Sequence, residues 1–244
     1  MGWNAKQTGG YATNDLQAQQ NANEMATTLT PKGWSLRAVC AMLGNVYLES
    51  GYNPWRWQGD NVPTESTFQN WDDTEEMRHG YGLFQFTPAK RYINRTTLNN
   101  YQRQGYSPKF FNAYARPTDG KAQTLFMADN FSSYWDYLFY DQYKAAFISL
   151  PEEVNIDDFW DMTVSEFLSA TWSDDRHGDT TIRLDCLVGA FELHFEKPGF
   201  GDAASSYQTR INACLDWRIY FAQNPPKPTI TKRFPLWMMI RFLP

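Results

Sequence analysis

The most constraining feature of the sequence is an apolar helical run that ends in one carboxylate, Glu49. The apolar positions of this run are Leu36, Val39, Cys40, Leu43 and Tyr47. This spacing gives a helix one face that must be buried. Gly51 suits the left-handed position that closes a helix, and Pro54 cannot continue one. The pattern therefore predicts a core helix, capped by Ser35, whose last turn carries Glu49.

Glu49 falls on the flank of the apolar stripe, so it can line a cleft while its helix is held in the core. The unpaired carbonyls at the end of a helix disfavour a negative charge. The nearby Tyr52, Trp55 and Trp57 could exclude water from the carboxyl, and both effects favour its protonated form. A glycosidase needs such a carboxyl to protonate a leaving sugar oxygen. We therefore predict that Glu49 is a catalytic acid.

A glycosidase usually needs a second carboxylate about 5–9.5 Å from the acid. The loop after Glu49 offers Asp60, Glu65, Asp72, Asp73, Glu75 and Glu76. Asp60 is the first choice, because Gly59 frees the backbone at the cleft edge and only a short aromatic segment separates it from Glu49. Asp72 and Asp73 remain alternatives.

The composition is that of a folded chain rich in flat aromatic side chains. Aromatic residues make up 17% of the 244 residues, with ten Trp and fourteen Tyr. They could bind the faces of sugar rings or simply build an aromatic core. The net charge of −5 argues against nucleic acid as a partner, because proteins that bind the phosphate backbone need basic surfaces.

The cysteines and histidines do not indicate a metal or a cofactor. The three cysteines, Cys40, Cys186 and Cys214, lie in apolar helical stripes, which indicates small buried residues rather than a disulfide framework. His177 and His194 lack acidic neighbours at the spacing of zinc ligands. We therefore expect no metal and no cofactor.

Capping residues and helical spacing predict a mainly α fold with seven or so helices and little sheet. The expected helices begin near Asp15, Ser35, Pro88, Asp119, Thr163, Asp179 and Asp202. Thr163 and Glu166 have the form of a capping box, and the helix from Asp119 is expected to continue towards Phe139. Residues 51–80 cluster Gly, Asn, Pro, Trp and acidic residues instead, which predicts a loop or small β region.

The two ends of the chain differ from this helical domain. We expect an N-terminal arm over residues 1–13, lying on the surface or on a partner, and the helical domain over residues 14–222. A Pro-rich linker followed by an apolar, basic tail is expected over residues 223–244. The tail is too short to span a bilayer. We expect it to pack on its own domain or on a neighbouring subunit, in preference to a membrane surface. The first residues also lack the apolar run of a secretory signal.

Two motifs in order resemble the paired signature of lysozyme-like muramidases and lytic transglycosylases. They are Glu49-Ser-Gly-Tyr-Asn-Pro54 and, after a loop, Gly80-Tyr-Gly-Leu-Phe-Gln-Phe-Thr-Pro88. Within that superfamily the chain is most similar to the tail-associated lysozymes of bacteriophages. Leu29-Thr-Pro31 and Phe195-Glu-Lys-Pro-Gly199 also look like that group, and the resemblance covers about residues 14–222.

The resemblance implies a lysozyme-like helical fold and cleavage between N-acetylmuramic acid and N-acetylglucosamine in peptidoglycan. Glu49 matches the general acid of the family, while Gln85 and Phe86 match the segment that lines the sugar cleft. Tyr81 is a further substrate-binding candidate. The acidic insertion at about residues 61–79 departs from the family pattern, and it leaves the identity of the second carboxylate open.

We therefore expect a virion-associated muramidase that thins the host cell wall at a phage tail tip, with the C-terminal tail docked on other tail proteins. A lytic transglycosylase would act on the same substrate but form an anhydromuramic end. A non-catalytic structural or wall-binding tail component is the alternative from another class. The glycan ends released from cell walls separate the three hypotheses. A muramidase releases hydrolysed ends, a lytic transglycosylase releases anhydro ends, and a non-catalytic component releases neither.

Overall fold

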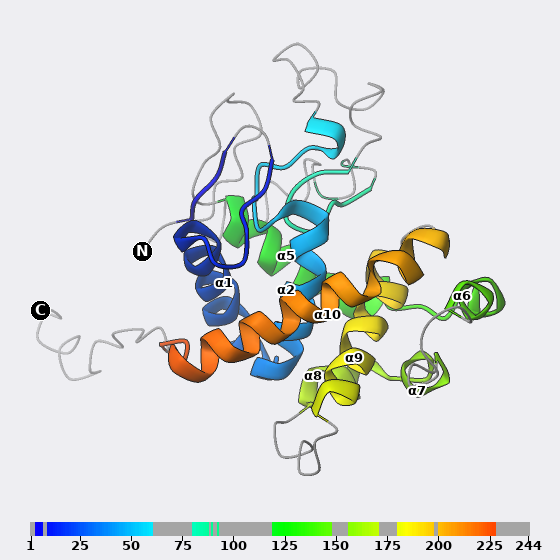
Figure 1. Ribbon diagram of the computed structural model, residues 1–244. Helices are drawn as coiled ribbons and strands as arrows, with labels where there is room; N and C mark the ends of the chain where they lie inside the picture. Colours follow the sequence, from blue (N-terminus) through cyan, green and yellow to red (C-terminus); the bar gives the residue numbers. More distant parts are fainter. Residues whose placement is uncertain are drawn as a thin grey trace, which may run out of the picture.

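The fold is built from helices that pack around one central helix (Figure 1). The computed structural model describes residues 3–6, 9–60, 80–87, 89, 92, 119–147, 156–170, 180–197 and 200–227. Its helices are α1 (Leu16–Leu29), α2 (Leu36–Ser50), α5 (Asp119–Tyr134), α6 (Tyr140–Phe147), α7 (Asp157–Trp160), α8 (Val164–Ser169), α9 (Thr180–Phe191) and α10 (Phe200–Gln223). Shorter turns are η1 (Thr30–Lys32), η2 (Gln58–Asp60) and the π-helical η6 (Glu192–Glu196). The prediction of a mainly α fold is confirmed.

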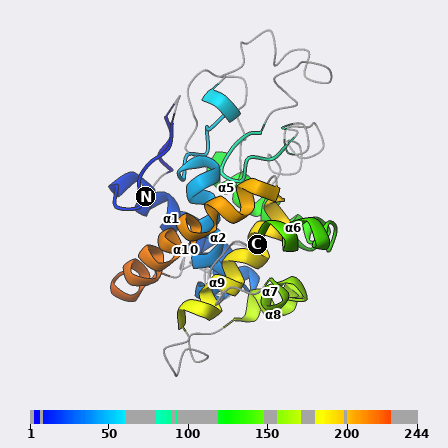
Figure 2. The same cartoon turned by 45° about the vertical axis from the view of Figure 1, so that its right-hand side comes forward.

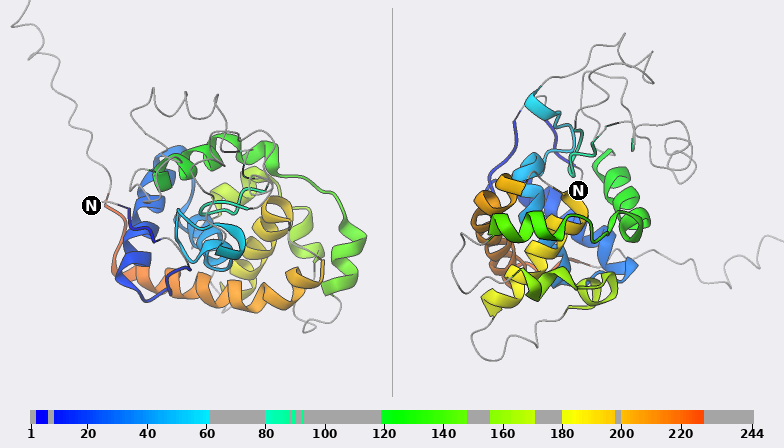
Figure 3. Two further views of the ribbon diagram at one scale, coloured as in Figure 1. Left: turned by 90° about the horizontal axis from the view of Figure 1, so that it is seen from above. Right: turned by 90° about the vertical axis from the view of Figure 1, so that its right-hand side faces the viewer.

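Helix α2 forms the centre of the domain. Seen from above, it lies within a ring formed by α1, α5, α9 and α10 (Figure 3, left). Residues 37–46 are all buried, so the helix is enclosed on nearly every side. The sequence spacing predicted only one buried face. A helix with this much apolar surface is stable only inside a core.

The longest helix, α10, packs along α2 (Figures 1 and 2). Gly44 permits their close approach, because a Cβ atom there would lie 2.5 Å from the Arg210 carbonyl oxygen and 3.0 Å from Cys214 Cβ. Contacts this short do not occur between real side chains and backbone, so the position requires glycine. The close approach brings Arg210 of α10 beside the last turns of α2.

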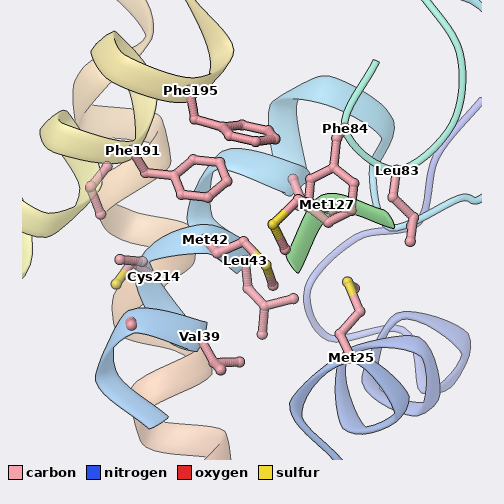
Figure 4. Packing of buried hydrophobic residues seen from close by; sticks show 14 of the residues in the cluster. Met25, Val39, Met42, Leu43, Leu83, Phe84, Met127, Phe191, Phe195 and Cys214 are labelled. Carbon is pink, nitrogen blue, oxygen red and sulfur yellow. The ribbon is translucent and has the colours of Figure 1, made fainter. Parts of the chain in front are cut away.

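The remaining core is strongly aromatic, and Figure 4 shows how it meets α2. Met42 and Leu43 of α2 lie at its centre, with Phe191 and Phe195 on one side and Met127 and Met25 on another. Phe195 also packs edge-on against Phe84, with ring centroids 6.1 Å apart. The aromatic residues thus build the core, and some of them reach the second motif.

Most expected helix ends are observed where the capping residue acts locally. The Ser35 side chain accepts a hydrogen bond from the Ala38 backbone N–H at 3.1 Å, Gly51 closes α2 in the left-handed conformation, and Thr163 with Glu166 forms the capping box of α8. These local signals were sufficient because they satisfy the backbone groups at helix ends.

Other helix boundaries were wrong. Helix α10 begins at Phe200, which leaves Asp202 inside the first turn, and α5 ends at Tyr134 instead of continuing towards Phe139. Helices α6 and α7 were not predicted. Such short helices depend on tertiary packing more than on their own sequence, here through contacts such as Phe147 on Tyr207.

The described part of the N-terminal arm packs onto the domain. Trp3 is buried against α5, and Asn4 exchanges hydrogen bonds with Asn21 of α1. The Tyr11 backbone N–H donates to the Gly51 carbonyl at 2.7 Å. The arm therefore contacts the turn that follows Glu49.

Several expectations lie outside the described residues, namely the helix from Pro88 to about residue 102, the acidic insertion with Asp72 and Asp73, the cap at Asp179 and the tail from residue 228 onward. Among the helices that the structure describes, none is long and apolar enough to cross a membrane. Cys40 and Cys214 are buried and Cys186 is half-buried, and none of the three forms a disulfide.

Candidate active site

A pocket of about 610 Å³ opens where the end of α2 meets the second motif. Its walls are formed by Glu49, Arg56, Gln58, Gly59, Phe84, Gln85, Phe86, Thr87, Tyr134, Phe195, Glu196 and Lys197. They come from α2, the following loop, the second motif, the end of α5 and η6. The two motifs identified in the sequence therefore meet at one cavity, with Glu49 in its wall.

Backbone pairing holds the loop after α2 against the second motif. The Gln58 N–H donates to the Gly80 carbonyl at 2.9 Å, and the Gly82 N–H donates to the Arg56 carbonyl at 2.8 Å. Isolated β-bridges join Trp57 to Tyr81 and Tyr81 to Phe86. Within the described residues these bridges are the only strand-like pairing. The expected loop or small β region is therefore observed for residues 51–60 and 80, while residues 61–79 of that prediction lie outside the described part of the chain.

Gln123 of α5 joins the two motifs, a role that the sequence did not suggest. Its side-chain oxygen accepts from the Leu83 N–H at 2.6 Å, and its amide nitrogen donates to the Pro54 carbonyl at 2.7 Å. Gly82 has a φ of 84°, and a Cβ there would lie 2.3 Å from the Gln123 oxygen. Glycine is thus required for the turn to meet the α5 side chain.

Asn53 in the first motif has a structural role. It is fully buried, its oxygen accepts from the Trp55 and Lys6 backbone N–H groups, and its nitrogen donates to the Lys6 and Gly9 carbonyls. A buried amide with all these hydrogen bonds fixes the turn after Glu49 against the N-terminal arm.

Glu49 lies at the expected place in the last turn of α2, and its partner is a cation. Its Oε1 accepts from Arg210 Nη2 at 2.8 Å, and its side chain is 20% exposed towards the pocket. Arg210 is nearly inaccessible and also donates to Asn45 Oδ1 at 3.0 Å. The sequence predicted an aromatic surrounding for Glu49 and gave no signal of this guanidinium.

A second carboxylate, Glu192, contacts the far side of Arg210. Its Oε1 lies 2.9 Å from Arg210 Nε and accepts from the Ser206 hydroxyl at 3.0 Å. Burial raises the pKa of Glu192 to about 7, and the nearby Arg210 and the Ser206 hydrogen bond offset only part of that effect. The charge of Glu49 raises the pKa of Glu192 as well.

Glu192 is expected to make the stability of the fold depend on pH. Its pKa rises from 4.5 to about 7 on folding, so its stabilising effect is complete below pH 4.5 and is lost as pH rises through 7, by about 3 kcal/mol. Urea unfolding at pH 5 and pH 8 measures the change in the free energy of unfolding. E192Q should show a smaller change, while Asp185, with a pKa raised by burial to about 6, acts in the same direction in both proteins. Equal changes in both proteins would contradict this role.

A third carboxyl, Glu196, lies at the end of η6 and lines the same pocket as Glu49. Its Oε1 is buried and makes no hydrogen bond within the described residues. Burial first, and then the charge of Glu49, raise the pKa of Glu196 well above its usual range. Sequence reasoning did not single out this residue, although it lies in the segment Phe195-Glu-Lys-Pro-Gly199 that looked like the phage tail group.

The predicted substrate-binding residues have different positions. Gln85 and Phe86 line the pocket, and the Gln85 amide donates to the Arg56 and Gly82 carbonyls at 3.2 and 3.0 Å. Tyr81 is fully buried between Trp57 and Tyr92 and does not line the pocket. Asp60 ends η2 next to the lining residues Gln58 and Gly59, but its side chain is outside the described set.

Among the described residues, no group of His, Cys, Asp and Glu side chains has the arrangement of a metal site. The acidic residues near Arg210 are instead organised around its guanidinium, where Glu49 and Glu192 each make an ion pair. The chemistry that these groups offer is proton transfer and charge stabilisation.

A central helix that ends in a glutamate, at a pocket closed by the second motif, defines the class of lysozyme-like helical domains. The chain belongs to the phage tail lysozyme family, whose model matches residues 20–220. It is also similar to morphogenesis protein 1 of Bacillus phage B103, with 37% identity over 83 residues. That match covers 34% of this chain and 20% of the phage protein.

Proposed function

We propose that this protein is a virion-associated glycosidase that cleaves peptidoglycan between N-acetylmuramic acid and N-acetylglucosamine. The observation that carries the proposal is the position of Glu49, a helix-terminal carboxyl in the wall of an open pocket that the second motif completes. A pocket of about 610 Å³ lies within the size range of small-ligand sites. Family membership supports the same substrate class.

The pocket walls suit a sugar ring. Phe84, Phe86, Tyr134 and Phe195 line the pocket. Phe84, Phe86 and Phe195 are mostly buried in the core, so they give the pocket an apolar floor against which an apolar sugar face could pack. Gln85 is the polar group that we expect beside the substrate, with its amide nitrogen already held by backbone carbonyls. Tyr81 lies behind this wall, where its backbone forms a β-bridge with the lining residue Phe86.

The reaction needs one carboxyl that protonates the leaving oxygen and one carboxylate that supports the positive sugar ring or activates water. Glu49 is one of the pair. Asp60 remains a candidate for the other, because its neighbours Gln58 and Gly59 line the pocket. Hydrolysis requires that a water molecule reach the cleaved ring, and the open pocket leaves room for one.

The products of cell-wall digestion test this function. Purified peptidoglycan incubated with the protein should release glycan ends that carry the mass of one added water, because hydrolysis consumes water, and mass spectrometry detects them. Anhydromuramic ends would instead identify a lytic transglycosylase. Binding to cell walls without new ends of either kind would contradict both enzymes and indicate a structural or wall-binding component.

The family and the Bacillus phage relative support a place in the virion. There the enzyme would open the host wall during entry, and its natural substrate would be intact peptidoglycan strands. We further propose that the apolar, basic residues after the Pro-rich linker dock the domain to other tail proteins. This docking follows from the sequence alone, since the tail lies outside the described residues.

A further inference from the structure

Three consecutive residues of the segment between α5 and α6 expose large apolar side chains. Tyr137 is 48% exposed, Leu138 58% and Phe139 53%. Within the described part of the chain, the other exposed large apolar residues are isolated positions on α1, α2 and α10. Isolated exposed apolar residues are ordinary, whereas a contiguous group indicates a binding surface. We call residues 137–139 the apolar rim.

The apolar rim is attached to a wall of the pocket. Lys197, which lines the pocket, forms an ion pair with one carboxylate oxygen of Asp136. The other oxygen of Asp136 accepts a hydrogen bond from the Leu138 backbone N–H at 3.2 Å. A single carboxylate thus joins the pocket wall to the middle of the rim. Tyr134, three residues earlier in the chain than Tyr137, lines the pocket itself.

Contacts with neighbouring elements hold the first residue of the rim in place. The Tyr137 ring lies edge-on to His194 of η6, with ring centroids 4.7 Å apart, and its hydroxyl donates to the Met162 carbonyl at 3.3 Å. The His194 ring nitrogen Nδ1 donates to the Asp136 carbonyl. These contacts fix Tyr137 while about half of it stays exposed. A surface that is already ordered binds a ligand with a smaller loss of entropy.

The backbone of the rim shares an unusual conformation with the pocket wall. Phe139 has a φ of 69°, in the left-handed region that bulky residues rarely adopt. Two other non-glycine residues with positive φ, Gln85 and Lys197, line the pocket. Such a backbone costs free energy and is concentrated at functional sites. The rim and the pocket wall therefore have the character of one surface.

The position of the rim suits a polymeric substrate. The segment that joins α5 to α6 runs along the outer edge of the domain (Figure 3, left), and Asp136 ties it to η6. A pocket of about 610 Å³ encloses only a short stretch of a glycan strand, so a bound strand must continue over the surface beside the pocket. We propose that the apolar rim is a further binding site for this strand. The inference rests on the proposed function and extends its substrate site.

The chemistry of the rim fits a strand of N-acetylhexosamine units. Each sugar ring has an apolar face of C–H groups, with hydroxyl and amide groups at its edge. Tyr137, Leu138 and Phe139 offer apolar surface to that face. Lys197, between the rim and the pocket, carries donors for the carbonyl of an N-acetyl group. The rim thus supplies exposed apolar surface, which the mostly buried phenylalanines of the pocket do not.

A protein partner is the other kind of occupant that an exposed apolar surface could have. A stable protein interface buries about 800 Å² on each partner, and three half-exposed side chains supply only part of that area. The Lys197–Asp136 ion pair instead makes the rim continuous with the pocket. The observations therefore favour the glycan strand.

Binding to purified, insoluble peptidoglycan tests the proposal without an activity assay. The variants are made in the E49Q background, so that the strand is not cut during the measurement. L138Q removes the central apolar side chain, and F139N places at position 139 a residue that tolerates the left-handed backbone. Together they should raise the peptidoglycan concentration for half-saturation by about 10-fold, because two apolar side chains no longer bury surface against the strand. The melting temperature should not change, since both side chains are exposed.

Matched controls come from exposed apolar residues on other elements. L16Q on α1 and I219Q on α10 remove side chains that are as exposed as Leu138 and that do not line the pocket. They should bind peptidoglycan like the E49Q protein. With Glu49 restored, the L138Q/F139N protein should show a higher KM for peptidoglycan and an unchanged rate on a tetrasaccharide fragment, because the short fragment lies within the pocket.

The proposal is overturned if L138Q/F139N binds peptidoglycan as tightly as its parent, if L16Q and I219Q weaken binding as much, or if the tetrasaccharide and the polymer are affected equally. Loss of incorporation into phage particles with normal wall binding would assign the rim to a protein partner, and would also overturn it. A wild-type protein that releases no glycan ends defeats the proposed function instead. The binding comparison still decides in that case whether the rim holds the strand.

Discussion

Replacing Glu49 by glutamine is expected to lower the release of glycan ends from purified peptidoglycan by about 1000-fold, within the range that one acid or base group contributes. Glutamine keeps the length of the side chain, and its amide oxygen can still accept the hydrogen bond that Arg210 donates to Oε1. The fold should therefore stay intact while the carboxyl group that we propose to act in the reaction is lost. The measurement is the initial rate of end formation, together with the melting temperature.

E24Q is the matched control for this experiment. This variant makes the same glutamate-to-glutamine change at a position on α1, away from the pocket. It should leave the rate of end formation unchanged. Equal rates for E49Q and the wild-type protein would show that the pocket at the end of α2 is not where the glycan is cleaved. A loss of rate together with a lower melting temperature would instead point to unfolding.

Removing the Arg210 guanidinium is expected to destabilise the protein by about 3–5 kcal/mol, the usual cost of breaking a buried ion pair on one side. R210M keeps much of the apolar stem but leaves Glu192 buried without its cation and Glu49 without its partner. Urea unfolding at pH 7 measures the loss in the free energy of unfolding. Activity should fall as well, because Arg210 holds the Glu49 carboxylate at the pocket.

Two comparisons isolate the charge effect in R210M. R218M removes an arginine from the same helix at a partly exposed position and should cost much less. The double variant R210M/E192Q should recover part of the stability, because no buried carboxylate then lacks its cation. If the double variant is less stable than R210M alone, lost packing and not unpaired charge explains the effect.

The sequence predicted those parts of the site that depend on neighbouring residues. Glu49 lies in the last turn of its helix because Ser35 and Gly51 set the ends of α2 locally. The meeting of the two motifs was also foreseen from their order and their resemblance to a known pattern. The contact that holds the two motifs together could not be predicted, because Gln123 hydrogen-bonds to Pro54 across 69 positions of the chain.

The electrostatics of the site could not be read from the sequence. Arg210 contacts Glu49 across 161 positions, and its place on α10 looks like that of any polar residue between buried ones. The position of the Glu196 side chain depends on a π-helical turn, and no capping residue in the sequence indicates that turn. Sequence spacing assumes regular helices, so a turn with a different period redirects side chains in a way that the spacing cannot reveal.

The aromatic residues near Glu49 illustrate the same limit. Tyr52 is buried against Trp217, and its hydroxyl accepts from the indole nitrogen at 2.7 Å. Trp57 packs on Tyr81 with ring centroids 4.4 Å apart. Both rings build the core beneath the loop, and the charged contact of Glu49 comes from another helix. Closeness in sequence was a poor guide to what surrounds the carboxyl.

The glycine contact between α2 and α10 makes the spacing of these helices a property of the backbone. Gly44 meets the Arg210 carbonyl directly, so no side chain of variable size separates Arg210 from the helix that carries Glu49. We therefore expect that substitutions elsewhere in the core leave the length of the Glu49–Arg210 ion pair unchanged. The charge beside the pocket would then be positioned by a backbone contact and not by the sizes of the core side chains.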